Sequence, residues 1–353
     1  KLAQAVLVEG RLLAATGQDD AARRLLARGA RDFPQDRELR LTYLRVLLEQ
    51  GRGKEARQEL ERMLQTWPGD GDIALSLALV EWESGDALAG EKRLVALAEA
   101  GYRADEAWLY AGRIASSRRA WGLAAAYFQN VRGPQYLAAQ MLVAQAWAQD
   151  GRLDDALELL AGLRAREPDA ASRLYLAESE LRQRAGQADQ ALAVLDAAVA
   201  EMPGDEDILY ARALAAERVG RLDVVEADLR AMLARSPDNP TALNALGYTL
   251  ADRTDRLDEA HDYINRALEL APEDPAILDS KGWVLFRLGR VEEAITWLRR
   301  AWALSRDGEI AAHLGEALWT AGRKQEARRI WQRALATDPD NRALRATLER
   351  LKP

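Results

Sequence analysis

Hydrophobic and polar residues along this chain follow the period of amphipathic helices, and turn residues interrupt the pattern at regular intervals. The final stretch, from Asn341 to Leu351, shows this plainly, because Leu344, Leu348 and Leu351 fall on one face of a helix. The strong helix formers Ala, Leu, Arg and Glu dominate the composition, whereas Val, Ile and Thr are too sparse for a sheet of any size. These features predict an all-α protein.

The turns carry a repeating signature. A glycine is followed five residues later by a small residue in the pairs Gly17/Ala22, Gly51/Ala56, Gly85/Gly90, Gly151/Ala156, Gly186/Ala191, Gly289/Ala294 and Gly322/Ala327, with Gly220/Val225 as a looser copy. A proline follows most of these glycines, at Pro34, Pro68, Pro168, Pro203, Pro237 and Pro339, and Pro272 fills the same place in the repeat that begins near Pro240. Most successive glycines lie 34 or 35 residues apart, so the chain predicts a repeated helix–turn–helix unit.

Each mark has a physical reason. The turn glycine ends the first helix of a unit in the left-handed conformation, which other residues adopt only at a cost. The small residue lets the second helix pack close to the first, and the proline ends the second helix. Another small residue lies inside the first helix, seven positions before the turn. We expect close helix packing there to offset the cost of a mid-helix glycine, about 1 kcal/mol, at Gly10, Gly112, Gly247, Gly282 and Gly315.

These marks and their period resemble the tetratricopeptide repeat (TPR), a helix–turn–helix unit of 34 residues. The resemblance implies an all-α TPR solenoid, a right-handed superhelix of about ten repeats. We predict ten units within residues 1–341 and a C-terminal capping helix over residues 342–353. Two units are irregular, since the third carries Gly90 where alanine is usual and the fourth has Arg119 in place of the turn glycine. The predicted units begin near residues 3, 37, 71, 105, 137, 172, 206, 240, 275 and 308.

A TPR solenoid exposes the first helix of each pair on its concave side, and the residues at those positions are the candidates for binding. They are Tyr210, Asn244, Tyr248, Asp279, Trp283, Phe286, Arg287, Glu316 and Trp319 toward the C-terminal end, and Arg11, Arg45 and Arg113 toward the N-terminal end. Aromatic residues and arginine dominate binding hot spots. One interpretation is an aromatic cradle and an arginine ladder that hold an extended or helical segment of a partner protein. The alternative is that several rings pack between helices and each arginine pairs with a nearby glutamate.

One familiar TPR ligand is the C-terminal carboxylate of a chaperone peptide, which such repeats clamp with lysine and a second polar residue. The corresponding positions hold Leu7/Arg11, Leu41/Arg45, Leu109/Arg113, Asn244/Tyr248 and Asp279/Trp283. No lysine is among them. The sequence therefore argues against a co-chaperone role.

The sequence offers no group of residues suited to catalysis. His313 shares its helix with Glu309 and Glu316, and we interpret it as part of an exposed helix face rather than a metal site. No phosphate-binding glycine loop, nucleophile elbow or H-E-x-x-H helix is present, and no carboxylate stands in an apolar setting that would shift its pKa. We expect no enzymatic activity, metal ion or cofactor. The formal net charge of −7, without a basic cluster, also argues against binding to nucleic acid.

The last third of the chain resembles one family more closely. The run NALGYTLADRTDRLDEAHDYINRALELAPEDPAILDSKGWVLFRLGRVEEAITWLRRAW covers residues 244–302, and DGEIAAHLGEALWTAGRKQEARRIWQRAL covers residues 307–335. Both are similar to the proteobacterial TPR lipoproteins typified by LbcA. The resemblance implies an adaptor that binds and activates a carboxy-terminal processing protease and delivers cell-wall hydrolases to it. It also implies an outer-membrane lipid anchor on the periplasmic side.

Other functions stay open. The chain could be a structural TPR arm of an envelope export machine, such as one that handles exopolysaccharide, or it could accompany a catalytic domain elsewhere in a longer protein. The chain begins at Lys1 without a methionine and holds no cysteine, so we expect a fragment whose targeting segment and lipidated cysteine lie upstream. In every case the expected partners are proteins, and contact with a membrane is expected only through that anchor.

Overall fold

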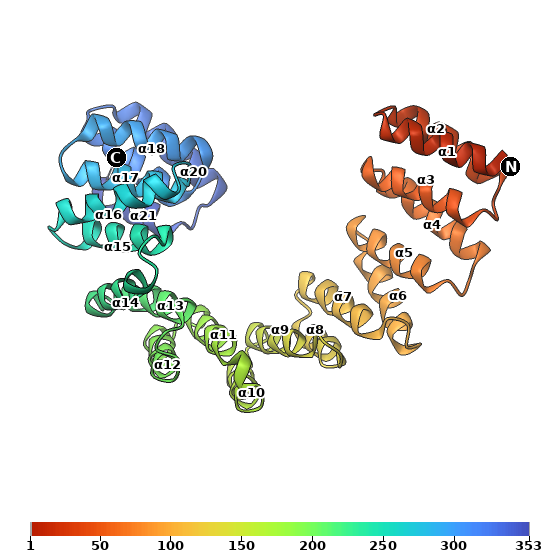
Figure 1. The fold of residues 1–353 in the computed structure, drawn as a ribbon, viewed down its shortest axis with the longest axis horizontal. Helices are drawn as coiled ribbons and strands as arrows, with labels where there is room; N and C mark the ends of the chain where they lie inside the picture. The colour runs from red at the N-terminus through yellow and green to blue at the C-terminus, as the bar shows by residue number, and fades with distance from the viewer. Residues whose placement is uncertain (1, 353) are drawn as a thin grey trace. The chain divides into compact units, whose positions relative to one another are not determined.

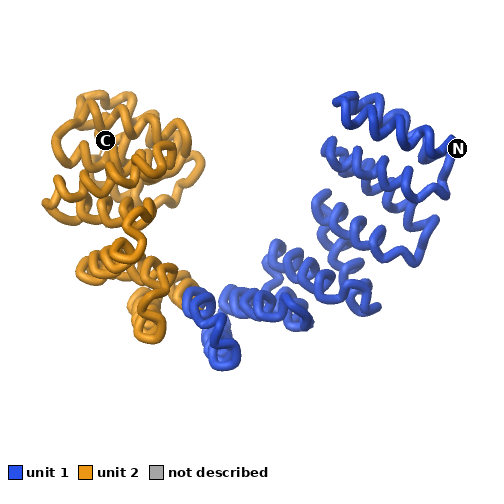
Figure 2. Tube along the Cα trace, in the orientation of Figure 1, with its two compact units in different colours: residues 1–177 blue, residues 178–353 orange. Residues whose placement is uncertain are grey.

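The computed structural model describes residues 2–352, and the predicted ranges extend beyond it only at Lys1 and Pro353. Every regular element in this part of the chain is a helix, which confirms the all-α prediction. The helices form two compact units, Lys1–Ala177 (unit 1) and Glu178–Pro353 (unit 2), shown in two colours in Figure 2. The division into ten repeats stays a prediction.

In unit 1, each helix from α1 to α9 packs against the next along the chain, as Figure 1 shows from α1 onward. Helix α1 also contacts α3. The boundary between the units falls within α11. The helices are α1 (Leu2–Ala15), α2 (Asp19–Asp32), α3 (Arg37–Glu49), α4 (Gly53–Thr66), α5 (Gly71–Glu83), α6 (Ala87–Glu99), α7 (Ala104–Ser117), α8 (Trp121–Phe128), α9 (Tyr136–Gln149), α10 (Leu153–Arg166), the short 3₁₀ helix Pro168–Ala170 and α11 (Ala171–Arg184).

Unit 2 follows the same plan and ends in a short amphipathic helix that packs on α19. Helix α17 contacts α15, α16, α18 and α19, so it lies at the centre of the largest part of this core. The helices are α12 (Ala188–Glu201), α13 (Glu206–Arg218), α14 (Leu222–Arg235), α15 (Pro240–Arg253), α16 (Leu257–Leu270), α17 (Pro275–Arg287), α18 (Val291–Leu304), α19 (Gly308–Thr320), α20 (Lys324–Thr337) and α21 (Arg342–Leu351).

The turns inside the helix pairs have the predicted left-handed backbone. The eight turn glycines, Gly17, Gly51, Gly85, Gly151, Gly186, Gly220, Gly289 and Gly322, have φ between 66° and 90°. Arg119 takes the same conformation at φ 59°. A non-glycine residue pays roughly 1–2 kcal/mol for it, so the fourth predicted unit keeps the turn geometry at the cost of backbone strain.

Seven of the turns between pairs end in an aspartate or asparagine that starts the next helix. Its side-chain oxygen accepts a hydrogen bond from a backbone N–H of the first helical turn and so satisfies one of the donors that a helix start leaves free. These N-cap residues are Asp36, Asp70, Asp205, Asn239, Asp274, Asp307 and Asn341. Where the proline of the repeat signature is present in these turns, it marks the end of one helix, and the N-cap residue after it marks the start of the next.

The mid-helix glycines allow the close packing that the sequence predicts. A Cβ atom at Gly112 would lie 2.3 Å from the Phe128 ring, and one at Gly315 would lie 2.0 Å from Nε1 of Trp331. The irregular third unit packs its two helices equally closely, but its glycine, Gly90, lies in the second helix and its alanine, Ala78, in the first. A Cβ at Gly90 would lie 2.5 Å from the Ala78 carbonyl oxygen. Gly90 is therefore a packing requirement rather than a sign of a degenerate repeat.

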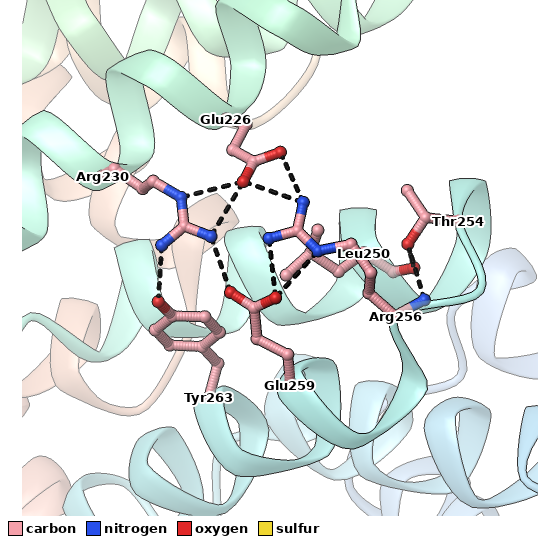
Figure 3. Close-up of polar contacts among 7 residues, drawn as sticks. All are labelled: Glu226, Arg230, Leu250, Thr254, Arg256, Glu259 and Tyr263. Atoms are coloured by element: carbon pink, nitrogen blue, oxygen red, sulfur yellow. Dashed lines mark hydrogen bonds and ion pairs between the residues drawn. The ribbon is translucent and has the colours of Figure 1, made fainter.

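A ring of charged side chains joins α14 to α16 in unit 2 (Figure 3). Arg230 donates to Glu226 at 2.9 Å and to Glu259 at 2.6 Å, and Arg256 contacts the same two carboxylates at 2.8 and 2.6 Å. The hydroxyl of Tyr263 accepts a further hydrogen bond from Arg230 at 3.0 Å. Hydrogen bonds from both arginines lower the pKa of Glu259. The ring thus holds the start of α16 against α14. This start follows the longer turn, residues 253–256, which contains no glycine.

Candidate functional site

A cleft of about 500 Å³ opens in unit 2 along α13, α15, α17 and α19. These are first helices of the predicted pairs. Four of the predicted binding residues, Tyr210, Asn244, Tyr248 and Asp279, line it together. The cleft therefore brings one aromatic or polar side chain after another from successive helices onto a single wall, although binding by these residues stays a prediction.

The cleft holds a buried carboxylate, that of Asp279, which is 6% exposed. Its Oδ2 lies 2.8 Å from Nδ1 of His313, a buried residue of the neighbouring helix α19. Its Oδ1 is buried and has no hydrogen-bond partner among the described residues. Burial by itself lowers the pKa of His313, but the Asp279 carboxylate more than offsets this and raises that pKa above 6.5. One oxygen of Asp279 is thus committed to the imidazole, and the other is buried without a partner among the described residues.

The remaining histidine has the opposite environment. Burial lowers the pKa of His261, and the positive charge of Lys281, whose Nζ lies 2.7 Å from His261 Nε2, lowers it further. Lys281 itself is buried on α17, and its ammonium also contacts Oδ1 of Asn265 at 2.5 Å. The two histidines of the chain are therefore expected to titrate on opposite sides of their ordinary pKa.

We predict that NMR of histidine-labelled protein shows the ring of His313 titrating above pH 6.5 and that of His261 below it. Because the folded pKa of His313 is raised, its pairing with Asp279 stabilises the fold below pH 6.5 and loses that effect as the pH rises through the raised pKa. Asp279→Asn should lower the pKa of His313. Two rings that titrate together near pH 6.5, or a His313 pKa unchanged in the variant, would contradict the prediction; His261→Asn assigns the signals.

The cleft is acidic at its edges as well as at its centre. Glu309 accepts a hydrogen bond from the Tyr248 hydroxyl at 2.8 Å, and burial raises the pKa of Glu217. Burial together with the charge of Glu309 raises the pKa of Tyr248, so its hydroxyl keeps its proton. Lysine and arginine are absent from the described residues that line the cleft. The site therefore presents carboxylates and phenol rings to whatever enters it.

Three predicted residues of α17 and its end lie behind the cleft rather than on its wall. Trp283 is 7% exposed, stacks on His313 with ring centroids 4.2 Å apart, and stacks on Phe286 at 5.2 Å. Arg287 donates to the backbone carbonyl of Asp252 at 2.9 Å and is half-buried. These surroundings favour the packing interpretation for the Trp283 ring, and contact with a partner stays a prediction for all three.

The last two predicted residues of the aromatic set lie near the C-terminal helix. Glu316 is buried and forms a two-pronged ion pair with Arg350 of α21, at 2.7 and 2.5 Å. The ring of Trp319 is half-buried, and the cations of Lys324 and Arg328 lie 4.8 and 5.3 Å from its centroid. Both side chains therefore have intramolecular partners in the uncomplexed chain.

The predicted arginine ladder lies in unit 1, and its three members are exposed. Arg11 donates to Glu38 at 2.8 Å, which matches the pairing that the alternative interpretation expects. The guanidinium of Arg113 lies 5.7 Å from the Tyr110 ring centroid. Arg45 has no ion pair among the described residues. Whether any of them contacts a partner stays a prediction.

Sequence reasoning missed the acidic partners of the cleft, and two of its statements are wrong. His313 is not on an exposed helix face, because it is buried against Asp279 of the preceding helix pair. Glu217 does stand in a setting that raises its pKa. The available signal was the repeat period, since Asp279 and His313 are 34 residues apart. The sequence interpretation considered only Glu309 and Glu316, which share a helix with His313. The contact of His313 with Asp279 instead joins equivalent positions of successive repeats.

No group of three or more His, Asp or Glu residues in the described part of the chain is placed to hold a metal ion. Among residues 2–352, no helix is both long and apolar enough to cross a membrane.

The architecture of successive antiparallel helix pairs with left-handed turns is that of an α-solenoid. Two tetratricopeptide repeat family models match the chain, one at residues 7–71, 148–206, 176–240, 210–275 and 249–309 and the other at residues 285–351. These matches include more than half of the chain, which therefore belongs to the tetratricopeptide repeat family. It is a TPR scaffold, an architecture suited to binding other proteins.

Several known proteins are similar to this chain. A TPR repeat-containing protein of Pseudomonas aeruginosa is 40% identical over 213 residues, which are 60% of this chain and 36% of that protein. The match thus spans about a third of the relative's length. A tetratricopeptide repeat protein from Parabacteroides merdae has a similar structure, with a TM-score of 0.52 and 15% identity over 79% of this chain and 97% of that one. A thermophilic TPR protein of Thermus thermophilus has a TM-score of 0.46 and 24% identity, covering 52% and 100% of the two chains.

Proposed function

We propose that this scaffold is an adaptor that binds and activates a periplasmic carboxy-terminal processing protease and presents cell-wall hydrolases to it. The observation that carries the proposal is the position of the cleft. Its walls come from α15, α17 and α19 together with α13. The first three belong largely to residues 244–302 and 307–335, the segments that resemble the adaptor lipoproteins. The cleft therefore lies in the part of the chain with the most specific resemblance.

The chain's own contribution in this proposal is binding, not catalysis. A scaffold that holds a protease and its substrate together raises their effective concentration, which increases the rate without any new catalytic group. Four of the five carboxylates of the cleft pair with tyrosine, histidine or backbone groups, and that of Glu217 has no hydrogen bond or ion pair among the described residues. We place the adaptor at the periplasmic face of the outer membrane, with a lipid anchor outside the present chain.

The proposal is tested with the purified chain immobilised and exposed to a periplasmic extract of the source organism. We expect it to retain a carboxy-terminal processing protease. In solution, the chain is expected to raise the rate at which that purified protease cleaves a cell-wall hydrolase by about tenfold or more. An unrelated TPR protein serves as the control for non-specific capture by the fold.

Two results would overturn the proposal. One is retention of export-machine components without the protease, which would support the structural arm of an envelope export machine instead. The other is capture of the protease with no change in its cleavage rate. That outcome would leave a binding protein without the activating role.

A further inference from the structure

We propose that the cleft of unit 2 binds the cationic side chain of a lysine or arginine in an extended segment of a partner protein. The inference rests on the proposed function, in that the partner is a protein, and it adds the chemical feature by which the partner is recognised. Four independent properties of the cleft support it: the placement of charge, two unsatisfied buried acceptors, the aromatic walls and the size.

The cleft is negatively charged, and groups of the chain itself compensate this charge only in part. Five carboxylates line it, of which Asp274 and Asp307 are N-caps whose oxygens accept backbone N–H bonds. Three remain, Glu217, Asp279 and Glu309, and the described lining has no lysine or arginine to balance them. Carboxylates gathered in a concave, poorly solvated site concentrate their field on whatever occupies it. That field favours a cation.

Two buried oxygen atoms of the lining lack a hydrogen-bond donor. Oδ1 of Asp279 on α17 and Oδ1 of Asn244 on α15 are both buried without a partner among the described residues. Leaving a buried acceptor unsatisfied costs roughly 1–3 kcal/mol, and more for a charged group. An ammonium has three N–H donors and a guanidinium has five, so either supplies several bonds at once. Both oxygens are closed to solvent in the free chain, so pairing with such donors requires the Asn244 and Asp279 side chains to rotate toward the cleft that they line.

The walls fit the rest of such a side chain. The rings of Tyr210 and Tyr248 line the cleft, and a cation over a tyrosine face gains about 0.5–2 kcal/mol. Leu214 and Ile277 add apolar surface against which the methylene stem of lysine or arginine can lie. A volume of about 500 Å³ admits one such side chain with its flanking backbone. A bare metal ion fits less well, because no described cluster offers three metal ligands.

The test uses two fluorescent peptides, Ala-Ala-Arg-Ala-Ala with blocked ends and the same peptide with citrulline, the uncharged analogue of arginine. Binding to the whole chain is measured by fluorescence anisotropy. We expect the arginine peptide to bind at least about tenfold more tightly than the citrulline peptide, since hydrogen bonds to charged groups are the strong ones. Higher salt should reduce this difference.

Two variants locate the site. Glu309→Gln keeps an oxygen to accept the Tyr248 hydroxyl but removes the charge, and Asp279→Asn removes the central charge. Each is expected to weaken binding of the arginine peptide about five- to tenfold. Glu269→Gln, an exposed glutamate of α16 outside the cleft, is the matched control and should bind as the unchanged chain does. Circular dichroism checks that each variant keeps its helices, and Glu309→Gln decides the outcome if Asp279→Asn loses them.

Several results would overturn the inference. They are equal binding of the two peptides, no binding of either, full affinity in Glu309→Gln, or methylguanidinium binding as tightly as the peptide, which would mark a free cation as the ligand. The proposed function fails separately. If the cleft variants capture the protease as well as the unchanged chain does, the adaptor role stands and the inference is wrong. If arginine recognition holds but no protease is captured, the adaptor role is wrong.

Discussion

Replacing Arg40 with methionine is expected to destabilise the α3–α4 pair of unit 1 by about 3–5 kcal/mol, because the change leaves the buried Glu59 carboxylate with only a 3.7 Å contact to Arg62. Arg40 and Glu59 are each 4% exposed at the side chain, and their Nε and Oε1 atoms lie 2.6 Å apart. Arg40 also donates to Thr66 Oγ1 at 3.0 Å and to the Pro34 carbonyl at 3.2 Å. Hydrogen–deuterium exchange should become at least about a hundredfold faster in α3 and α4.

Two comparison variants show whether the cause is the stranded charge. Arg40→Met combined with Glu59→Leu should recover most of the lost stability, since a buried ion pair replaced by apolar side chains is often neutral. Arg28→Met removes an exposed pair with Asp32 and should cost no more than about 0.5 kcal/mol. If Arg40→Met were as mild as Arg28→Met, or if the double variant were no better than the single one, the ion pair would not be what holds these helices.

The fold was predictable because its determinants are local. A turn glycine with positive φ and a proline each act within a few residues, and they recur often enough to be recognised. At Arg119 the turn keeps the left-handed backbone conformation, with φ 59°, although no glycine is present. The turn geometry of the repeat is therefore retained even where its signature residue is missing. Gly90 was harder to interpret. Its need for space depends on the carbonyl of Ala78 in the facing helix, and only the packed pair shows that the two small residues have changed places.

The candidate site was predictable only in part, because its chemistry depends on contacts between successive repeats. Register along the first helices placed Tyr210, Asn244, Tyr248 and Asp279 on one surface, and these four do line one cleft. Register does not tell how deeply a side chain is buried. It could not separate Asp279, which lines the cleft and has one unpartnered oxygen, from Trp283, which is buried and does not line it.

Trp283→Ala is expected to destabilise the α17–α19 region of unit 2 by about 3–5 kcal/mol, the usual cost of removing a buried large aromatic side chain. The ring stacks on His313 and Phe286, and its Nε1 donates to Oδ1 of Asp252 at 3.2 Å. Exchange in α17 and α19 should therefore become at least about a hundredfold faster. Binding of the arginine peptide should weaken as well, because His313 positions Asp279.

Trp319→Ala is the matched control, since that ring is only half-buried and lies under Lys324 and Arg328. It should cost about 1 kcal/mol and leave exchange in α17 unchanged. A Trp283→Ala variant with normal exchange but reduced capture of a partner would mean that the ring contacts the partner directly, as the aromatic-cradle interpretation requires. Faster exchange with peptide binding restored by Trp283→Phe would instead show that the ring acts by holding His313 and Asp279 in place.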